Sequence, residues 1–478
     1  MSDPSETTAT EETQSDVFGL FNIHQELTDM GNADRFVNVC GDDFRYCTLW
    51  HKWLYWNGKS WKIDDGEMVV NRAMKFVRYC RDIAKSAQLP KKFADALGDY
   101  LYKCENNSKI QAMLTLARAK LSIAPDELDR DPWLFNCSNG TLDLRTGEIR
   151  PHDREDLISK MSPVAYSPMS ECPKWEAFLD DIMMGKKELI EFLQAYLGYC
   201  LTGTTGNQLF VIAYGTGQNG KTVLGNVLLK IMGTYADELP VAMIMRKKGD
   251  EEKIEGMHRF MGLRLALFAE GEHGQQLAEG KIKTLTGGDK INARFLYGEG
   301  FSFSSSCKLI LRTNHKPQIY GTDHAIWRRV NLMPFDYRIP DDKKVDHYDD
   351  VLVDAEAAGI LDWMIQGCVF WQRNGLPKSE SIKESTETYR LSEDPIGDFL
   401  SSRCLIMADG RSTVKTLYEN YVGFCEGEKI KPLGKKNFNQ TLEERDFARK
   451  KFAEGSTWYG IALRGEASES PAEKEIPF

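Results

Sequence analysis

The sequence predicts a multidomain α/β protein, in which a central, mostly parallel sheet follows an α+β domain and precedes a small helical domain. Two patterns carry this prediction. Apolar strands alternate with amphipathic helices between residues 206 and 340, as in a parallel sheet covered by helices. Aromatic strand-like stretches before residue 150, and helical spacing after residue 341, set the flanking parts apart.

The bulk composition is that of an ordinary globular protein. The chain has 478 residues, 42% of them hydrophobic, enough for several domains that each bury a core. No apolar run approaches the roughly 18 residues of a membrane span, and the first 16 residues lack the basic start and apolar stretch of a signal peptide. We therefore expect no membrane contact and a cytoplasmic protein. The 11 cysteines include no C-x-x-C pair, which predicts reduced core residues and no structural metal.

The formal net charge of −10 argues against a protein that coats nucleic acid over its whole surface. Phosphate binding needs clustered Lys and Arg, so any DNA contact must be local.

The first elements are a hairpin and a set of helices. Residues 1–16 are acidic and Ser/Thr-rich and predict a disordered tail. Residues 44–63 are aromatic and carry Asn57-Gly58, a pair that favours a tight hairpin turn. Helical spacing follows over 66–122. A second hairpin, turning at Thr146-Gly147, completes an α+β domain that we expect to span 17–150.

A linker and helical segment is predicted over 151–205, with helical spacing from Pro173 onward. The core domain, 206–340, comes next, and a further helical segment spans 341–393. Residues 394–478 predict a small domain of three helices and a final aromatic strand.

The basic stretch of this last domain has two interpretations. Residues 429–451 hold eight Lys or Arg against three acidic residues, around a helix with the look of a DNA recognition helix. DNA binding and a merely solvated basic helix are equally compatible with that pattern.

The sharpest motif is a strand, a glycine-rich turn and an amphipathic helix over residues 207–233. The turn matches G-x-x-x-x-G-K-[ST], in which backbone amides wrap phosphates, the lysine reaches the β- and γ-phosphates and the hydroxyl holds Mg²⁺. A glycine-rich turn without a ligand is the alternative. The predicted nucleotide-binding residues are Gly215, Thr216, Gly217, Gln218, Asn219, Gly220, Lys221 and Thr222.

Two later strands end in polar residues that suit hydrolysis. The strand over 264–272 ends in Glu270 and Glu272, which share one face because they are two apart. One acid is expected to help Thr222 hold Mg²⁺ and the other to polarise the attacking water. A solvated strand end is the alternative. Asn314 follows the next strand, at the edge where α/β sheets bind ligands, and its amide can orient water.

A pair of arginines completes the predicted catalytic set. Arg328 and Arg329 follow an apparently buried Trp327. One of them can stabilise the γ-phosphate charge in a neighbouring subunit. The alternative is a surface pair that makes ordinary salt bridges.

Together, the strings GTGQNGKT, FAEGE, LRTNHKP and GTDHAIWRR and residues 281–303 closely resemble the helicase part of phage and plasmid primase-helicases. These proteins belong to superfamily three of helicases, in the AAA+ class, and are related to poxvirus primase-helicases. The resemblance implies a central AAA+ P-loop NTPase domain and, from DPIGDFL onward, a C-terminal winged-helix domain. It also implies a hexameric ring with ATP and Mg²⁺ between subunits and DNA through the centre.

The resemblance assigns roles to the predicted residues. Lys221 and Thr222 match Walker A, Glu270 and Glu272 match Walker B, and Asn314 matches sensor 1. Arg328 or Arg329 matches the arginine finger. Several members have adjacent Walker B acids, whereas Gly271 separates them here, so the identity of the catalytic acid stays open.

The resemblance also places a hairpin in the ring channel. Lys290, Arg294 and Tyr297 are the candidates for contact with DNA phosphate or bases. Packing of this hairpin between subunits is the alternative.

We therefore expect an ATP-dependent, ring-forming DNA helicase for phage or plasmid replication, in the cytoplasm of a bacterial host. Its expected partners are single-stranded or forked DNA, copies of itself in a ring, and a separate primase or polymerase, since no primase domain fits before residue 150. The rival function is a nucleotide-dependent regulator or protein-remodelling AAA+ ATPase without unwinding activity.

Overall fold

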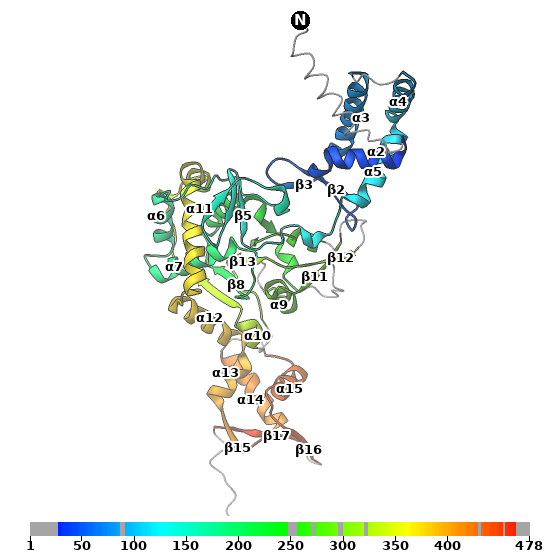
Figure 1. Cartoon of the computed structure of the whole chain (residues 1–478). Helices are drawn as coiled ribbons and strands as arrows, with labels where there is room; N and C mark the ends of the chain where they lie inside the picture. Colours follow the sequence, from blue (N-terminus) through cyan, green and yellow to red (C-terminus); the bar gives the residue numbers. More distant parts are fainter. Residues whose placement is uncertain are drawn as a thin grey trace, which may run out of the picture.

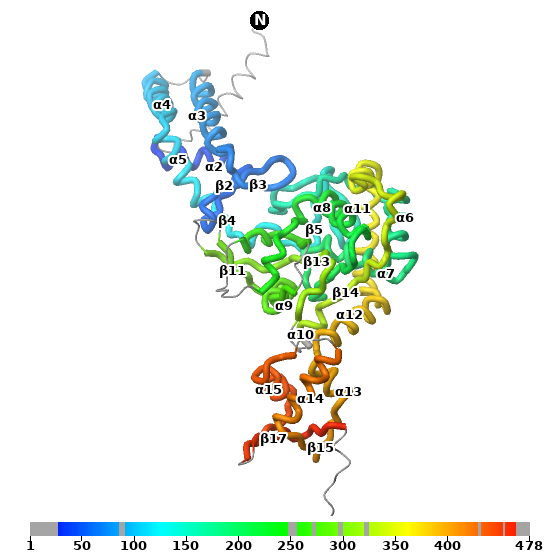
Figure 2. Tube along the Cα trace, turned by 180° about the vertical axis from the view of Figure 1, so that it is seen from behind, coloured from blue at the N-terminus to red at the C-terminus, as the bar shows by residue number. Residues whose placement is uncertain are grey.

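The computed structural model describes residues 27–86, 91–246, 256–269, 274–294, 300–319, 324–428, 432–452 and 455–464. It is a mixed α/β, multidomain protein with a central parallel sheet, as predicted. Figure 1 shows an N-terminal body and a C-terminal domain at opposite ends of a larger central body. The view from behind in Figure 2 shows the same row.

The N-terminal body packs four helices on a small sheet. Its elements are α2 (Asp29–Cys40), β1 (Phe44–Cys47), β2 (Lys52–Trp56), β3 (Trp61–Ile63), α3 (Met68–Ser86), α4 (Lys91–Cys104), α5 (Asn107–Lys120) and β4 (Ser122–Ile123). The strands run in the order β3-β2-β1-β4, with β4 parallel to β1 and the rest antiparallel. Gly58 turns between β2 and β3 at φ 92°, as the Asn57-Gly58 pair predicted.

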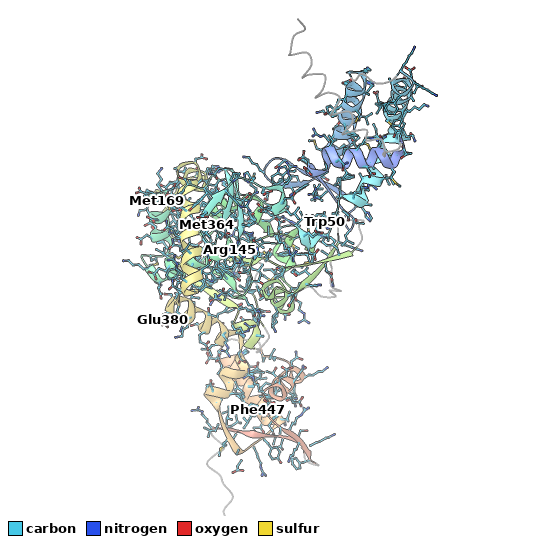
Figure 3. All side chains as sticks on the ribbon, viewed as in Figure 1. Trp50, Arg145, Met169, Met364, Glu380 and Phe447 are labelled. Carbon is cyan, nitrogen blue, oxygen red and sulfur yellow. The ribbon has the colours of Figure 1, made fainter. Side chains whose placement is uncertain are left out.

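Two tryptophans join the N-terminal body to the central body. Trp50 lies between β1 and β2, is buried, and has its ring 6.2 Å from the ring of Phe301 in the central body. Figure 3 shows Trp50 at this junction. Trp61 is buried as well, and its indole N–H donates to the Arg154 carbonyl at 2.8 Å. The junction therefore combines an aromatic contact with polar ones, which include the ion pair between Arg154 and Asp43 at 3.0 Å.

A three-stranded antiparallel sheet and two helices lead into the central body. They are β5 (Leu134–Cys137), β6 (Gly140–Asp143), β7 (Glu148–Arg150), α6 (Pro173–Ile182) and α7 (Lys187–Cys200). Gly147 makes the predicted β6–β7 turn. The domain predicted over 17–150 ends with this sheet, yet Phe135 and Leu142 are buried in the same cluster as Trp175 of α6. Its packing therefore ties the sheet to the central body.

The central sheet has five parallel strands in the order β14-β8-β13-β10-β9. The elements of this part of the central body are β8 (Phe210–Tyr214), α8 (Lys221–Met232), β9 (Ala236–Leu239), β10 (Leu265–Ala269), α9 (Glu279–Gly287), β11 (Lys290–Arg294), β12 (Gly300–Ser304), β13 (Lys308–Thr313), α10 (His324–Trp327) and β14 (Val330–Pro334). Every residue of β13 is buried, as helices on both faces require. Because β8 lies between β13 and β14, the loops after these three strands open side by side.

Two helices follow the sheet, α11 (Tyr348–Asn374) and α12 (Glu380–Glu393), and both lie within residues 341–393. α11 and α7 approach to backbone contact through glycines. A Cβ at Gly198 would lie 2.0 Å from the Cys368 nitrogen, and a Cβ at Gly367 would lie 2.1 Å from the Gln194 carbonyl oxygen. Only glycine allows this approach.

Two buried cations lie at the C-terminal end of α7. The Lys308 ammonium donates to the carbonyls of Thr202, Thr204 and Ser306, and the Arg264 guanidinium donates to that of Leu201. Carbonyls at a helix C-terminus carry partial negative charge, so cations suit this place. Burial lowers the pKa of Lys308 to about 8.

A buried carboxylate holds α6 against α11. Glu356 departs from helical geometry inside α11, with φ −136° and ψ 18°. Its carboxylate accepts the backbone N–H groups of Lys174 and Trp175, in the first turn of α6, at 3.0 and 2.9 Å. An anion at a helix N-terminus satisfies amides that have no partner within the helix.

The C-terminal domain has a core of its own around Phe399, Tyr421, Phe438 and Trp458. Its elements are α13 (Pro395–Arg403), β15 (Cys404–Thr413), α14 (Val414–Gly427), α15 (Lys435–Glu444), β16 (Arg449–Phe452) and β17 (Gly455–Leu463). The helices α13, α14 and α15 and the strand β17 lie in the segment for which three helices and a final strand were predicted. The strands β15 and β16 were not predicted, and they flank β17 in an antiparallel sheet.

All 11 cysteines are buried and free, which confirms their predicted place in the core. Burial raises the pKa of the Cys137 thiol to about 12. Among the described helices, none combines the length and the apolar character needed to cross a membrane.

The glycine contact between α7 and α11 predicts a stability effect. Gly198→Ala or Gly367→Ala should lower the free energy of unfolding by about 1–3 kcal/mol, because the added methyl meets backbone atoms. Gly280→Ala is the matched control in α9 of the same body, where a Cβ would meet nothing within 4 Å. It should be neutral or stabilising by up to about 1 kcal/mol. Urea denaturation measures the free energy of unfolding of all three variants. Equal effects at the three positions would contradict the close approach.

Candidate nucleotide site

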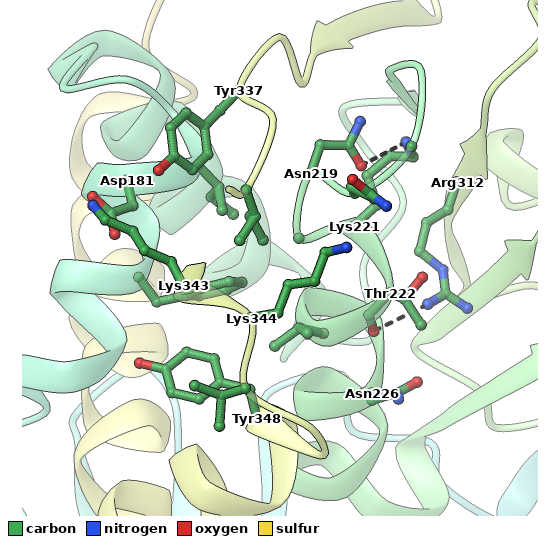
Figure 4. Close-up of a pocket in the computed structure, with 18 of the residues that line it drawn as sticks. Asp181, Asn219, Lys221, Thr222, Asn226, Arg312, Tyr337, Lys343, Lys344 and Tyr348 are labelled. Atoms are coloured by element: carbon green, nitrogen blue, oxygen red, sulfur yellow. Dashed lines mark hydrogen bonds between the residues drawn. The ribbon is translucent and has the colours of Figure 1, made fainter. Parts of the chain in front are cut away.

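A cavity of about 880 Å³ lies at the C-terminal edge of the central sheet, between the loops after β8, β13 and β14 and the helix α6. Figure 4 shows this cavity. Its polar lining consists of Asp181, Gln218, Asn219, Lys221, Thr222, Asn226, Glu238, Arg312, Asn314, Tyr337, Lys343, Lys344 and Tyr348.

The glycine-rich turn has the backbone that its glycines permit. Gly217 and Gly220 have φ 104° and 81°, in the region that side chains disfavour, and Gly220 directly precedes the first turn of α8. A Cβ on Gly215 would lie 2.3 Å from the Phe335 carbonyl oxygen, after β14. The N-terminus of α8 therefore faces the cavity, and its amides make a site suited to an anion.

Lys221 connects the turn to the neighbouring strand. Its ammonium donates to the Gly215 carbonyl at 2.8 Å, to Asn219 Oδ1 at 2.8 Å and to Asn314 Oδ1 at 3.1 Å. The lysine is 6% exposed. The structure thus brings together two predicted residues, Lys221 and Asn314, that are far apart in the sequence.

Asn219 fixes the other side of the turn. Its side-chain Nδ2 donates to the Phe335 carbonyl at 3.1 Å, while its Oδ1 accepts from Lys221. The turn is therefore anchored to the end of β14 as well as to β13. Thr222 is exposed at the cavity, where its hydroxyl is able to hold a hydrated cation.

Arg312 is a site residue that the sequence analysis missed. It is 6% exposed, its Nη2 lies 2.6 Å from Glu238 Oε2, and its Nη1 lies 3.4 Å from the Thr222 carbonyl oxygen. A Cβ at Gly225 of α8 would lie 2.1 Å from Nη1, so a glycine makes room for the guanidinium. A signal existed: Arg312 is two residues before Asn314 on a strand, and such residues share a face.

The opposite wall of the cavity was also not predicted. It combines Asp181 of α6 with Tyr337, Lys343 and Tyr348 from the segment after β14, and Figure 4 shows them across from Arg312. The Tyr348 ring lies 5.9 Å from the Phe178 ring of α6. No motif marks these residues, because they come from a loop and a helix that meet only in the fold.

The two candidate arginines have different environments. Arg329 is 7% exposed, and its guanidinium donates to Thr286 Oγ1 at 3.2 Å and to the Ala325 carbonyl at 2.6 Å. Arg328 is exposed and donates to Gln208 Oε1 at 2.5 Å. Both lie outside the cavity, just before the N-terminal end of β14, whereas the cavity lies past the C-terminal ends of the strands.

The predicted hairpin is present. β11 and β12 pair antiparallel, with Lys290 opposite Ser304 and Arg294 opposite Gly300. Alternate residues of β11 are exposed, so Lys290, Asn292 and Arg294 share the solvent face. Ile291 and Ala293 face the core of the central body.

Three predicted site residues, Glu270, Glu272 and Tyr297, lie outside the described residues. The strand that leads to the acids is β10, whose last residue, Ala269, lines the cavity.

Two protein families match parts of this chain. A family described as "D5 N terminal like" matches residues 33–184, and a "Family of unknown function (DUF5906)" matches residues 213–329. The second match covers the segment from β8 to Arg329, which includes the turn, Asn314 and the arginine pair.

Several viral proteins are related over larger stretches. A protein of Acanthamoeba polyphaga mimivirus named "Putative helicase" is 28% identical over 51% of this chain and 26% of its own length. A "Putative primase" of African swine fever virus is 24% identical over 63% of this chain and 33% of its own length. A "Putative helicase" of Invertebrate iridescent virus 6 is 24% identical over 68% of this chain and 38% of its own length. The chain thus matches at most about two fifths of the length of these relatives.

A solved structure, the apo form of the NrS-1 C-terminal region, matches 88% of this chain and 96% of its own chain, with 12% identity and a TM-score of 0.49. The similarity of motifs and the relatives named as helicases and primases agree with one another. Over part of its length, this chain is therefore similar to viral proteins that are named as helicases and primases.

Proposed function

We propose that this chain is an ATP-dependent DNA helicase that works as a ring in phage or plasmid DNA replication. The observation that carries the proposal is the meeting of Lys221 and Asn314 at the N-terminus of α8, within 3.1 Å. This is the arrangement expected of a site that binds a triphosphate and positions water at its last phosphate. The viral relatives named as helicases and primases support the same kind of function.

The proposed chemistry follows from the cavity. Backbone amides of residues 215–222 would bind the phosphates of ATP, and Lys221 would exchange its protein acceptors for phosphate oxygens. Thr222, with one of Glu270 and Glu272, would hold Mg²⁺, which neutralises phosphate charge, and the other acid would polarise the attacking water. Asn314 would orient the attacking water, and Arg312, held by Glu238, adds fixed positive charge beside Thr222.

The domain plan supports an AAA+ core and a winged helix. The strand that leads into the phosphate turn, β8, lies inside a five-stranded parallel sheet, and Asn314 directly follows its neighbour β13. The C-terminal domain combines three helices with a small antiparallel sheet, as a winged-helix domain does.

The position of Arg328 supports a site that is shared between subunits. The five residues of β14 separate it from the cavity by roughly 16 Å within its own chain. An exposed arginine at that edge is free to act only on a nucleotide held by another copy. Arg329 is buried and holds α9 to the end of α10, so Arg328 is the better finger.

The first prediction concerns Lys221. Lys221→Ala should abolish ATP hydrolysis and strongly weaken nucleotide binding, by about 10²-fold or more, since it removes the cation at the turn. Lys230→Ala is the matched control on the same helix. Its ammonium pairs with Asp349 and Asp350 outside the cavity, so turnover should persist. Binding of a fluorescent ATP analogue and phosphate release measure both, and normal turnover of the Lys221 variant would refute the site.

The second prediction separates the arginines and tests the ring. Arg328→Ala should keep the stability and ATP binding of the parent protein but lower turnover by roughly 10³-fold or more. Arg329→Ala should instead lower the free energy of unfolding by about 1–3 kcal/mol, because Thr286 and Ala325 lose their donor.

An experiment that mixes the two kinds of variant subunit completes this test. Rings that combine Arg328→Ala with Lys221→Ala subunits contain some interfaces with an intact turn and an intact finger. Partial activity should return in the mixture. A mixture that co-assembles, as native mass spectrometry can establish, and yet stays inactive would rule out the shared site.

The third prediction concerns the hairpin. Lys290→Ala/Arg294→Ala/Tyr297→Ala should reduce DNA-stimulated ATPase and unwinding while basal hydrolysis persists. The control is Lys383→Ala/Arg390→Ala, which removes exposed cations that pair with Glu380 and Glu387 on α12. If single-stranded DNA does not raise the ATPase activity of the parent protein, the result would favour the rival function, a ring that remodels a protein partner.

A further inference from the structure

The excess positive charge of the C-terminal domain does not lie on the helix α15. α15 carries Lys435 and Lys436 at its start and Glu443 and Glu444 at its end, so its charges balance. The excess is on the strand β16, where Arg449, Lys450 and Lys451 are consecutive and exposed. A recognition helix therefore does not account for the basic stretch. Its excess charge lies on the sheet.

The outer face of this sheet carries a row of three side chains from its three strands. Tyr459 of the middle strand β17 lies opposite Arg411 of β15. The Arg411 guanidinium lies 5.3 Å from the centre of the Tyr459 ring, and the Lys450 ammonium of β16 lies 5.0 Å from it. Trp458, the preceding residue, is buried on the other face, in the core of the domain. One aromatic ring thus holds two cations.

This arrangement positions the cations without neutralising them. A cation over an aromatic ring keeps its full charge, whereas an ion pair cancels it. Arg449 shows the contrast, because it pairs with Glu443 at 2.5 Å. Among the described residues, no carboxylate lies within ion-pair distance of Arg411 or Lys450, although Asp409 is close in sequence.

We propose that the outer face of the β15-β17-β16 sheet binds the phosphate backbone of duplex DNA, with Arg411 and Lys450 as contacts and Tyr459 as the residue that positions them. The argument is charge complementarity. In a chain with a net charge of −10, two exposed and uncompensated cations held side by side are suited to adjacent phosphates. The competing explanation is that Lys450 only protects the edge strand β16 from pairing with other chains.

The site is separate from the proposed channel. It belongs to the domain at the far end of the molecule from the N-terminal body, whereas the β11–β12 hairpin is part of the central body (Figures 1 and 2). DNA binding here does not require nucleotide hydrolysis. It can therefore be measured without ATP, and its outcome does not depend on the helicase proposal.

The test uses the full chain without nucleotide and a labelled 20-base-pair duplex, titrated at several salt concentrations. Arg411→Gln/Lys450→Gln should lower the slope of log affinity against log salt by about 1.8, since each phosphate contact contributes about 0.9. Binding at 0.15 M salt should weaken roughly tenfold or more. The matched control, Lys383→Gln/Lys415→Gln, removes the same charge from cations paired with Glu380 and Glu419 and should bind as the parent does.

Tyr459 supplies a second, independent measurement. Tyr459→Phe keeps the ring and should bind DNA as the parent does. Tyr459→Leu removes the ring, leaves both charges, and should weaken binding. The proposal is overturned if Arg411→Gln/Lys450→Gln binds the duplex with the affinity and salt slope of its control, as edge protection alone would give. It is likewise overturned if both double variants weaken binding equally, since net charge alone would then explain the loss.

Discussion

The hydrogen bonds of the Lys221 ammonium are the constraint on which the site depends. One cation is held by the Gly215 carbonyl, the Asn219 amide and the Asn314 amide, so a single group fixes the turn to β13. A buried ammonium is costly unless acceptors surround it. Those acceptors meet only if β8 and β13 are neighbours, and the parallel pairing of these strands provides this. The geometry of the site is thus a consequence of the strand order.

The helices that cover the central sheet are held to one another by close contacts. Gly198 and Gly367 bring α7 and α11 into backbone contact. Glu356 of α11 then holds the first turn of α6, the helix that carries Asp181 and Phe178 to the cavity. These contacts join α6, α7 and α11 beside the cavity.

The two ends of the molecule add surfaces that the central body lacks. The N-terminal body contacts the hairpin strand β12 through Trp50, whose ring lies 6.2 Å from the ring of Phe301. The C-terminal domain has a separate core and exposes the row of Arg411, Tyr459 and Lys450. The proposed nucleotide site and these outer surfaces therefore lie in different parts of the molecule.

The sequence by itself determined the local features: the glycine-rich turn, the hairpin turns at Gly58 and Gly147, the helix that starts at Pro173, and the buried cysteines. Each depends on backbone preference or on periodicity, which are readable over a few residues. Only the tertiary structure decided that Arg329 is buried while Arg328 is exposed, and that Arg312 and Tyr348 line the cavity. Adjacent arginines look alike in a sequence, and their difference arises because Thr286, 43 positions away, accepts from only one of them.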